Sequence, residues 1–162
     1  MGKLLLDDNG YKQFIEELEK LKALSDKSAV AGSDAYDSAV GDGWHDNFAF
    51  EESMRESRLI AKRIDDMYDQ KKNIKIIEDN KTDKNTVNLN DKVLVEITYS
   101  EDDKEQEIVI LTGKYIPDIQ GGIKEITINS PIGKTIYKAK VGTTQKYKVD
   151  DREIQIRIIS KQ

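Results

Sequence analysis

Apolar residues in the first part of the chain recur at the spacing of helical turns. Within residues 6–24, Phe14, Leu18 and Leu21 lie three or four positions apart, which places them on one face of an α-helix. A short polar run precedes this stripe and can supply its N-cap, namely Asp7, Asp8 or Asn9. The pattern predicts a first amphipathic helix.

A second helical stripe follows in residues 48–77. Its apolar positions, which Lys71 interrupts, are Ile60, Ile64, Met67 and Ile74. Neither stripe can be buried alone, so the two arms are expected to form an antiparallel helical hairpin. Toward the turn, the first arm replaces large apolar residues with Ala, Gly and Ser, which predicts a slender, weakly stabilised far end. Local fraying and insertion into a narrow space are both consistent with such an end.

Residues 78–91 form a polar stretch that is typical of a linker. After it, the spacing of the apolar residues changes from helical to alternating. Residues 92–100 and 105–113 alternate apolar and polar side chains around an acidic turn, so they predict a β-hairpin. Further strands are predicted over residues 124–130, 146–151 and 152–160.

A short helix is predicted over residues 130–142, with a Ser-Pro start and Gly142 at its end. The expected fold class is therefore α+β, with an N-terminal helical hairpin in residues 1–79 and a small antiparallel sheet domain in residues 80–162. The expected sheet core consists of Val93, Val95, Ile108, Ile110, Ile126, Ile128, Ile154, Ile156 and Ile158.

Composition sets limits on the class of protein. Charged residues make up 35% of the 162-residue chain, and no apolar run approaches the roughly 18 residues that cross a bilayer. A soluble protein with no membrane partner is expected. The absence of cysteine excludes a disulfide framework and a thiolate metal site, and with no signal-like N-terminus it suits the cytoplasm.

Charge is distributed unevenly along the chain. Residues 1–80 contain 12 Lys and Arg against 18 Asp and Glu, whereas residues 81–162 contain 14 against 13, which indicates two modules. No basic residue occurs between Lys27 and Arg55, where the acidic residues are Asp34, Asp37, Asp42, Asp46, Glu51 and Glu52. Such a field repels a nucleic-acid backbone and attracts cations or a basic surface, unless it is only a solvated face.

Three segments resemble one known family across essentially the whole chain. They are "NGYKQFIEELEKLK", "TGKYIPD" and "INSPIGKTIYKAKVGTTQKYKV", with Thr143 where the family often has Asp. The sequence is similar to the bacterial GreA/GreB transcript cleavage factors, which pair a helical hairpin with an FKBP-like C-terminal domain. The resemblance implies RNA polymerase as the partner, and it carries the docking role over to Asp118, Ser130 and Pro131.

The expected hairpin turn also resembles the family. The segment "GDGWHDN" aligns with a family motif, Gly-Asp-Leu-Ser-Glu-Asn, whose acidic pair is thought to hold Mg²⁺ inside the polymerase. The resemblance implies that Asp42 and Asp46 hold Mg²⁺ weakly alone and share it with the polymerase active site. Here three residues separate the carboxylates where the family has two. The longer turn with Gly43 either restores the same carboxylate position or abolishes it.

The aromatic residues around this turn have two interpretations. Trp44 and Phe48 either stack on a base or a channel wall, or fold back and anchor the turn on the hairpin. His45 either takes part in proton transfer or is a bystander.

A basic stripe follows the turn. Arg55, Arg58 and Lys62 occupy positions i, i+3 and i+7, and Arg63 is adjacent. The resemblance implies contact with the 3′ end of the nascent RNA. The alternative is pairing along the helix with the nearby acidic residues Glu51, Glu52 and Asp66.

The resulting functional hypothesis is a monomeric elongation factor that inserts its coiled coil into the polymerase secondary channel and stimulates cleavage of backtracked RNA. It would serve another enzyme's active site and would not be an enzyme itself. The first alternative is a Gre-like channel regulator that inhibits or pauses transcription without cleavage. The second is an FKBP-like isomerase or chaperone module, which is disfavoured because no Phe or Trp lies beyond residue 50.

Overall fold

The structure is a computed structural model that describes residues 2–38, 48–78, 83–100 and 102–162. Two compact units are present, one formed by Phe14–Asn73 and the other by Met1–Gln13 together with Ile74–Gln162. The N-terminal segment and residues 74–78 therefore group with the sheet, which differs from the expected division between residues 79 and 80.

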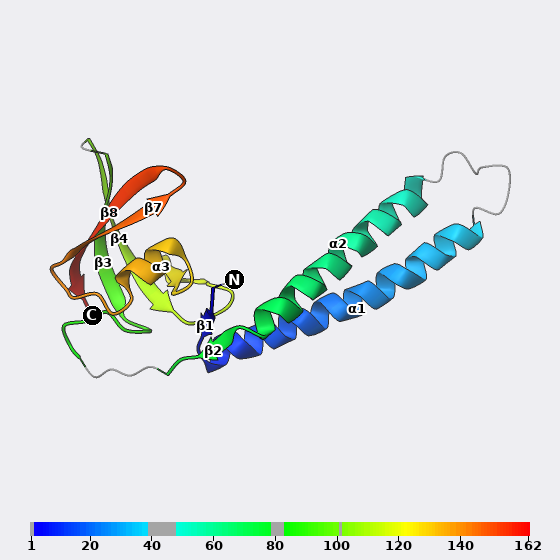
Figure 1. Ribbon diagram of the computed structural model, residues 1–162, viewed down its shortest axis with the longest axis horizontal. Coiled ribbons are helices and arrows are strands. Elements are labelled where there is room, and N and C mark those ends of the chain that lie inside the picture. The colour runs from blue at the N-terminus through cyan, green and yellow to red at the C-terminus, as the bar shows by residue number, and fades with distance from the viewer. Residues whose placement is uncertain (1, 39–47, 79–82, 101) are drawn as a thin grey trace. The chain divides into compact units, whose positions relative to one another are not determined.

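The first unit is a helical hairpin made by α1 (Asp8–Ser38) and α2 (Phe48–Lys71), which lie side by side (Figure 1). The helices are antiparallel, because Ser28 of α1 contacts Ser57 of α2 while Lys22 lies 5.4 Å from the ring centroid of Tyr68. Large apolar side chains are buried along the line where the two helices meet, which we call the seam. They are Phe14, Leu18, Ile60 and Met67. The expected hairpin is thus present, with Leu21 and Ile64 half-buried beside these residues.

The start of α1 follows the sequence pattern. Asp7 precedes the helix, and its Oδ1 accepts a hydrogen bond of 2.7 Å from the Gly10 N–H. This N-cap was one of the three expected candidates.

The end of the second arm differs from the expectation. Ile74 does not continue the helical stripe: α2 ends at Lys71, and Ile74 begins the short strand β2 (Ile74–Ile76). That strand pairs in parallel with β1 (Leu4–Leu6). The helix ends because Asn73 folds back, its N–H donating to the Gln70 carbonyl at 2.9 Å, and the β-branched run that follows favours a strand.

The second unit contains a six-stranded sheet with the order β5-β6-β4-β3-β8-β7. Its strands are β3 (Lys92–Ser100), β4 (Asp103–Thr112), β5 (Ile119–Gln120), β6 (Ile123–Thr127), β7 (Thr144–Val149) and β8 (Arg152–Lys161). The α+β class is confirmed, but the sheet is mixed because β6 runs parallel to β4. The helix α3 (Pro131–Ile136) lies over one face of the sheet and contributes Ile136 to the core (Figure 1).

The core follows the expected list except on β4. Val109 and Leu111 are fully buried there, whereas Ile108 is 47% exposed and Ile110 is only half-buried. Four consecutive apolar residues, 108–111, leave the alternation of this strand undefined in the sequence. The assignment of Ile108 and Ile110 to the core was therefore displaced by one residue, which exchanges the two faces of the strand.

The predicted linker is partly core. Within residues 83–91, Val87 and Leu89 are fully buried, so this part of the segment is no linker. Asp91 anchors it, because its carboxylate accepts hydrogen bonds from the Asn88 N–H at 2.7 Å and the Lys161 Nζ at 2.9 Å.

The helix α3 is shorter than predicted. It ends at Ile136 rather than at Gly142, since Lys138 adopts a left-handed backbone conformation with φ of 62°. The Lys138 N–H then donates to the Val87 carbonyl at 2.8 Å, which joins the end of this helix to the buried segment.

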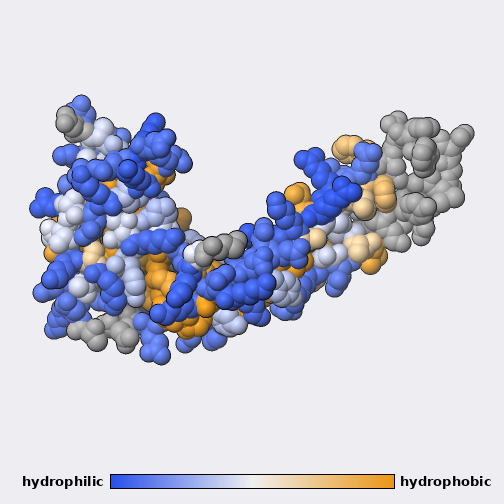
Figure 2. All heavy atoms as spheres, in the orientation of Figure 1, coloured by the Kyte–Doolittle hydropathy of each residue, from blue (hydrophilic) through white to orange (hydrophobic). Residues whose placement is uncertain are grey.

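Hydrophilic residues cover most of the visible surface (Figure 2). Among the helices that the structure describes, none has both the length and the apolar character needed to cross a membrane.

Candidate functional site

The predicted site residues fall into three regions of the chain. Asp42 and Asp46, the expected metal pair, lie outside the described residues, as do Trp44 and His45. The basic residues lie on α2. Of the predicted docking residues, Ser130 and Pro131 lie at the start of α3, and Asp118 lies in the loop between β4 and β5.

The basic stripe occupies the exposed side of α2. Arg55, Arg58 and Lys62 are all exposed, and at about 100° per residue they span roughly 60° of the helix circumference. Ile60 and Met67, which are buried in the seam, lie on nearly the opposite side. The stripe is therefore available to a ligand while the seam holds the hairpin together.

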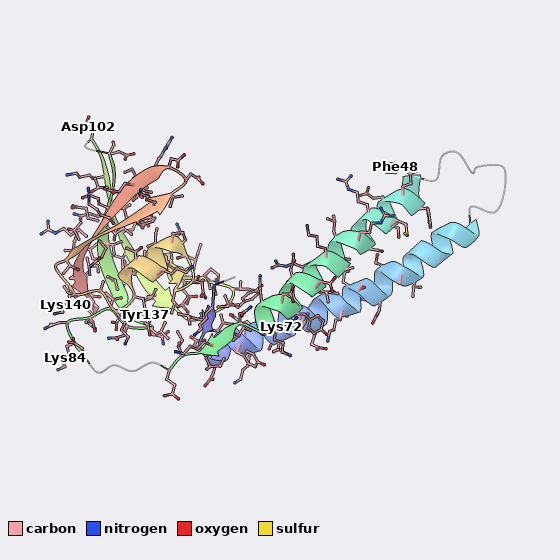
Figure 3. The ribbon with its side chains drawn as sticks, viewed as in Figure 1. Phe48, Lys72, Lys84, Asp102, Tyr137 and Lys140 are labelled. Carbon is pink, nitrogen blue, oxygen red and sulfur yellow. The ribbon has the colours of Figure 1, made fainter. Side chains whose placement is uncertain are left out.

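Pairing along the helix was the alternative role for the residues of this stripe. Within the described part of the chain, Arg55, Arg58 and Lys62 form no ion pair, so the alternative of pairing with Glu51, Glu52 and Asp66 is not seen. Phe48, at the first turn of α2, is 78% exposed and does not fold against the hairpin (Figure 3). Exposed cationic and aromatic side chains thus lie on the same helix, α2.

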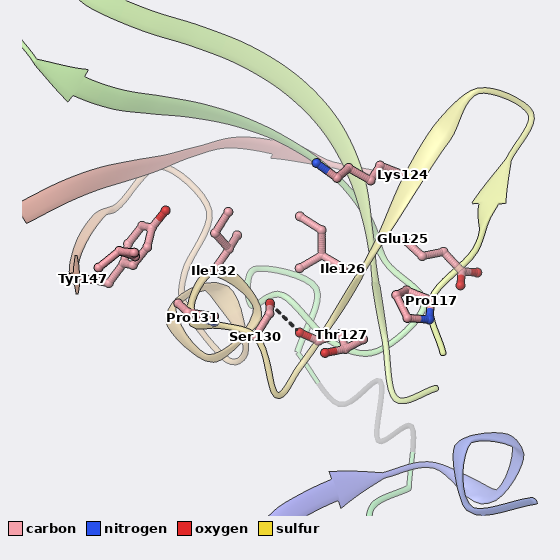
Figure 4. Close-up of a pocket in the computed structure, with 10 residues that line it drawn as sticks. Pro117, Lys124, Glu125, Ile126, Thr127, Ser130, Pro131, Ile132 and Tyr147 are labelled. Carbon is pink, nitrogen blue, oxygen red and sulfur yellow. Dashed lines mark hydrogen bonds between the residues drawn. The ribbon is translucent and has the colours of Figure 1, made fainter. Parts of the chain in front are cut away.

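Ser130 builds the turn that precedes α3. Its Oγ accepts a hydrogen bond of 3.0 Å from the Gly133 N–H and donates to the Thr127 carbonyl at 2.8 Å (Figure 4). Pro131 occupies the first turn of the helix, where its missing N–H costs nothing. A Cβ on Gly133 would lie 1.9 Å from the Thr127 carbonyl oxygen, so only glycine allows this close approach.

Asp118 lies in a loop that is organised by a buried carboxylate. Glu125 is 5% exposed, pairs with the Lys114 Nζ at 2.7 Å, and accepts a hydrogen bond of 2.9 Å from the Asp118 N–H. The Asp118 carbonyl accepts from the Glu125 N–H at 2.9 Å, which closes the loop. Asp118 itself stays exposed. Sequence reasoning missed Glu125 and Lys114, because their spacing of eleven residues matches no local motif.

A groove of about 430 Å³ joins the two loops (Figure 4). Its wall is largely apolar and contains Pro117, Ile126, Ile132 and Tyr147 beside Ser130 and Pro131. Burial raises the pKa of the Tyr147 phenol. Ser130 and Pro131 thus line one groove. Asp118 does not line it but follows Pro117, which does. The four apolar wall residues come from separate segments, so no sequence pattern joined them.

Comparisons with known proteins place this arrangement in a family. The family model described as "Transcription elongation factor, GreA/GreB, C-term" matches residues 81–161. The transcription elongation factor GreA of Caldanaerobacter subterraneus subsp. tengcongensis is 32% identical over 158 residues, which cover 96% of this chain and 95% of that protein. The chain belongs to the GreA/GreB family of transcription elongation factors.

The chain is also similar to solved structures of proteins described as GreA-type factors. GreA factor homolog 1 (Gfh1) of Thermus thermophilus is 18% identical, with 99% of each chain covered and a TM-score of 0.44. A GreA/GreB factor from Nitrosomonas europaea is 14% identical, with 98% of each chain covered and a TM-score of 0.37.

The GreA/GreB family model spans the groove and all three predicted docking residues. No group of three or more His, Asp or Glu residues that could hold a metal occurs among the described residues. The metal-binding prediction for this GreA/GreB-family chain therefore rests on the segment 39–47, which the structure does not describe.

Proposed function

We propose that this GreA/GreB-family chain binds bacterial RNA polymerase and stimulates cleavage of backtracked transcripts. The observation that supports this most is the 32% identity to a GreA protein, because it extends over 96% of the chain and so includes both units. The chain would act as a cytoplasmic monomer and would leave the bond-breaking chemistry to the polymerase.

Docking is assigned to the face formed by the groove and the loop of Asp118. Pro131 and the apolar wall offer surface to bury, and the exposed Asp118 carboxylate offers a charged group at the rim. The Ser130 hydroxyl is already engaged with the Thr127 carbonyl and the Gly133 N–H, so Ser130 acts by shaping α3.

The hairpin would reach the nascent RNA. Arg55, Arg58 and Lys62 are exposed on one side of α2 without an ion pair to any described residue, which leaves their charges available for phosphate groups. The exposed ring of Phe48 on the same helix can stack on an unpaired base at the RNA 3′ end.

The turn would supply carboxylates to the polymerase active site. Asp42 and Asp46 are oxygen ligands of the kind that Mg²⁺ accepts, and two carboxylates suffice when water and a second protein complete the shell. Asp42 and Asp46 would hold the ion, whose chemistry when bound would be to make a water molecule acidic enough to attack the phosphodiester. The role of this chain is to hold the two carboxylates there.

A specific observation favours one alternative. Three residues separate Asp42 from Asp46, including Gly43, and the second acid has a shorter side chain than the Glu of the family motif. If this turn displaces the pair, the chain occupies the secondary channel and inhibits or pauses transcription without cleavage.

One assay separates these functions. Stalled, backtracked elongation complexes are mixed with the protein, and the RNA is resolved on a gel in parallel with RNA synthesis. Faster shortening supports the cleavage factor, whereas slower synthesis without shortening supports the channel regulator. Isomerisation of a prolyl peptide without polymerase binding would contradict both and support the FKBP-like isomerase.

A further inference from the structure

Two side-chain amides connect the first 13 residues to the proposed docking face. Asn129, which precedes Ser130, makes a pair of hydrogen bonds with the backbone of Leu5 in β1. The Leu5 N–H donates to Asn129 Oδ1 at 2.9 Å, and Asn129 Nδ2 donates to the Leu5 carbonyl at 2.7 Å. The amide thus satisfies both backbone groups of one residue, as a neighbouring strand would.

Gln13 makes the corresponding connection to the loop that carries Asp118. Its Oε1 accepts hydrogen bonds from two successive backbone groups, the Tyr115 N–H at 3.1 Å and the Ile116 N–H at 3.3 Å. Gln13 lies on the second turn of α1, so a helix side chain fixes the backbone of a loop more than 100 residues away.

The approach of α1 to this loop requires glycine. A Cβ on Gly10 would lie 2.2 Å from the Gly113 carbonyl oxygen, and a larger residue would push the helix away. The same carbonyl accepts a hydrogen bond of 3.0 Å from the Asp7 N–H. The loop is therefore held at two places. Its start is bound by the Asp7 N–H beside the N-terminus of α1, and its next residues are bound by the Gln13 side chain.

We infer that Gln13 and Asn129 are positioning residues for the docking face, through which the first 13 residues of the chain hold the loops of Asp118 and Ser130 in their binding conformation. This inference rests on the proposed docking function. It implies that residues 81–161, the part that the family model matches, are an incomplete docking unit. It also assigns the first turns of α1 a role in docking, a role that it does not assign to the rest of the hairpin.

Substitutions of Gln13 in the full-length chain test the inference. Gln13→Met keeps the length of the side chain but removes the acceptor, whereas Gln13→Glu keeps an acceptor oxygen. Gln155→Met is the matched control, since Gln155 is exposed on β8 and its side chain forms no hydrogen bond with the described residues. Two quantities are measured for each variant, hydrogen exchange at the Tyr115 and Ile116 amides and affinity for RNA polymerase.

Gln13→Met is expected to accelerate exchange at both amides by roughly tenfold and to weaken polymerase binding by about threefold to tenfold. Gln13→Glu and Gln155→Met are expected to leave both quantities near the wild-type values. Asn129→Leu should repeat the loss of affinity, with faster exchange at the Leu5 amide instead.

The outcomes that contradict the inference are distinct from failure of the proposed function. Unchanged exchange in Gln13→Met would show that the amide does not hold the loop. Faster exchange with unchanged affinity would show that the loop conformation does not matter for docking, which overturns the positioning role. If the wild-type chain does not bind polymerase, the proposed function fails, and the docking role assigned to Gln13 and Asn129 fails with it.

Discussion

The two units of the molecule differ in how they are stabilised. Among its described residues, the sheet unit buries a continuous cluster of fourteen apolar residues, which extends from Val87 to Ile158. Among the described residues of the hairpin unit, only Phe14, Leu18, Ile60 and Met67 are buried apolar side chains. The sheet unit is therefore held by a core, whereas the hairpin is held by a seam.

The composition of the seam also changes along the hairpin. Close to the sheet unit in sequence, Phe14 and Met67 are fully buried. Farther along, the described contacts between the helices include a hydrogen bond of 2.6 Å between the hydroxyls of Ser28 and Ser57. A polar contact of this kind contributes little net stability, since water can replace it when the helices separate.

Under the proposed function, the parts of the chain that set stability are separate from those that would set activity. The sheet unit can hold the loops proposed for docking rigidly because its core fixes the strands on either side of them. The hairpin presents exposed charges on one helix side and needs only enough apolar contact to keep two helices together. Substitutions should therefore affect stability in the sheet unit and activity at the far end of the hairpin.

The largest effect on stability is expected for Ile156→Ala. Ile156 is fully buried on β8, between β3 and β7, so its truncation should lower the free energy of unfolding by about 2–5 kcal/mol. Ile108→Ala is the matched control, because Ile108 is 47% exposed and should cost less than about 1 kcal/mol. Urea unfolding followed by circular dichroism measures both. Equal losses would contradict the face assignment of β4.

A large effect on activity without loss of stability is expected at the hairpin turn. Asp42→Asn or Asp46→Asn should reduce stimulated transcript cleavage by about tenfold to a hundredfold, because each removes one metal-binding charge while preserving shape. The double variant should resemble either single variant, and raised Mg²⁺ should partly restore a single variant.

The control for this prediction is Asp26→Asn, which changes the same charge at an exposed position of α1. It should leave cleavage unchanged, and none of these variants should alter polymerase affinity. Wild-type cleavage rates in both Asp42→Asn and Asp46→Asn would show that the pair does not deliver the metal.

Periodic parts of the sequence predicted the fold well, and parts without a defined period did not. The stripe of Phe14 and Leu18 defines one helix face, and the hairpin follows from it. At Ile108 the run of four apolar residues fits either face of a strand, so only pairing with β3 decides which side is buried. At Val87 and Leu89, surrounding polar residues concealed two core positions.

The site was predicted unevenly for the same reason. Ser130 and Pro131 belong to a local motif, a helix N-cap followed by proline, that sequence shows directly. Other contributions were not visible in the sequence. The side chains of Gln13 and Asn129 bind segments that lie more than 100 residues away, and Glu125 binds the Asp118 N–H at a spacing that matches no local motif. Their functions depend on tertiary contacts, which no spacing rule reveals.

A moderate effect is expected at the polar seam. Ser28→Ala leaves the Ser57 hydroxyl without its partner and should destabilise the hairpin by about 0.5–1.5 kcal/mol. The double variant with Ser57→Ala should return to within about 0.5 kcal/mol of the wild type, because both hydroxyls are gone and alanine favours the helix. Hydrogen exchange of the α1 amides around Ser28 measures these differences. Additive losses in the double variant would show that the two serines are not coupled.

The smallest effect is expected for the basic stripe. Arg55→Ala and Arg58→Ala should each weaken crosslinking of the hairpin to the RNA 3′ end by about twofold to threefold, since each removes one phosphate contact among several. Both side chains are exposed opposite the seam, so the helix content and the free energy of unfolding should not change. Lys20→Ala, at an exposed position of α1, removes the same charge from the other helix and should leave crosslinking intact. An equal loss in all three variants would indicate a response to net charge alone. A loss confined to Arg55 and Arg58 would place the RNA along this side of α2.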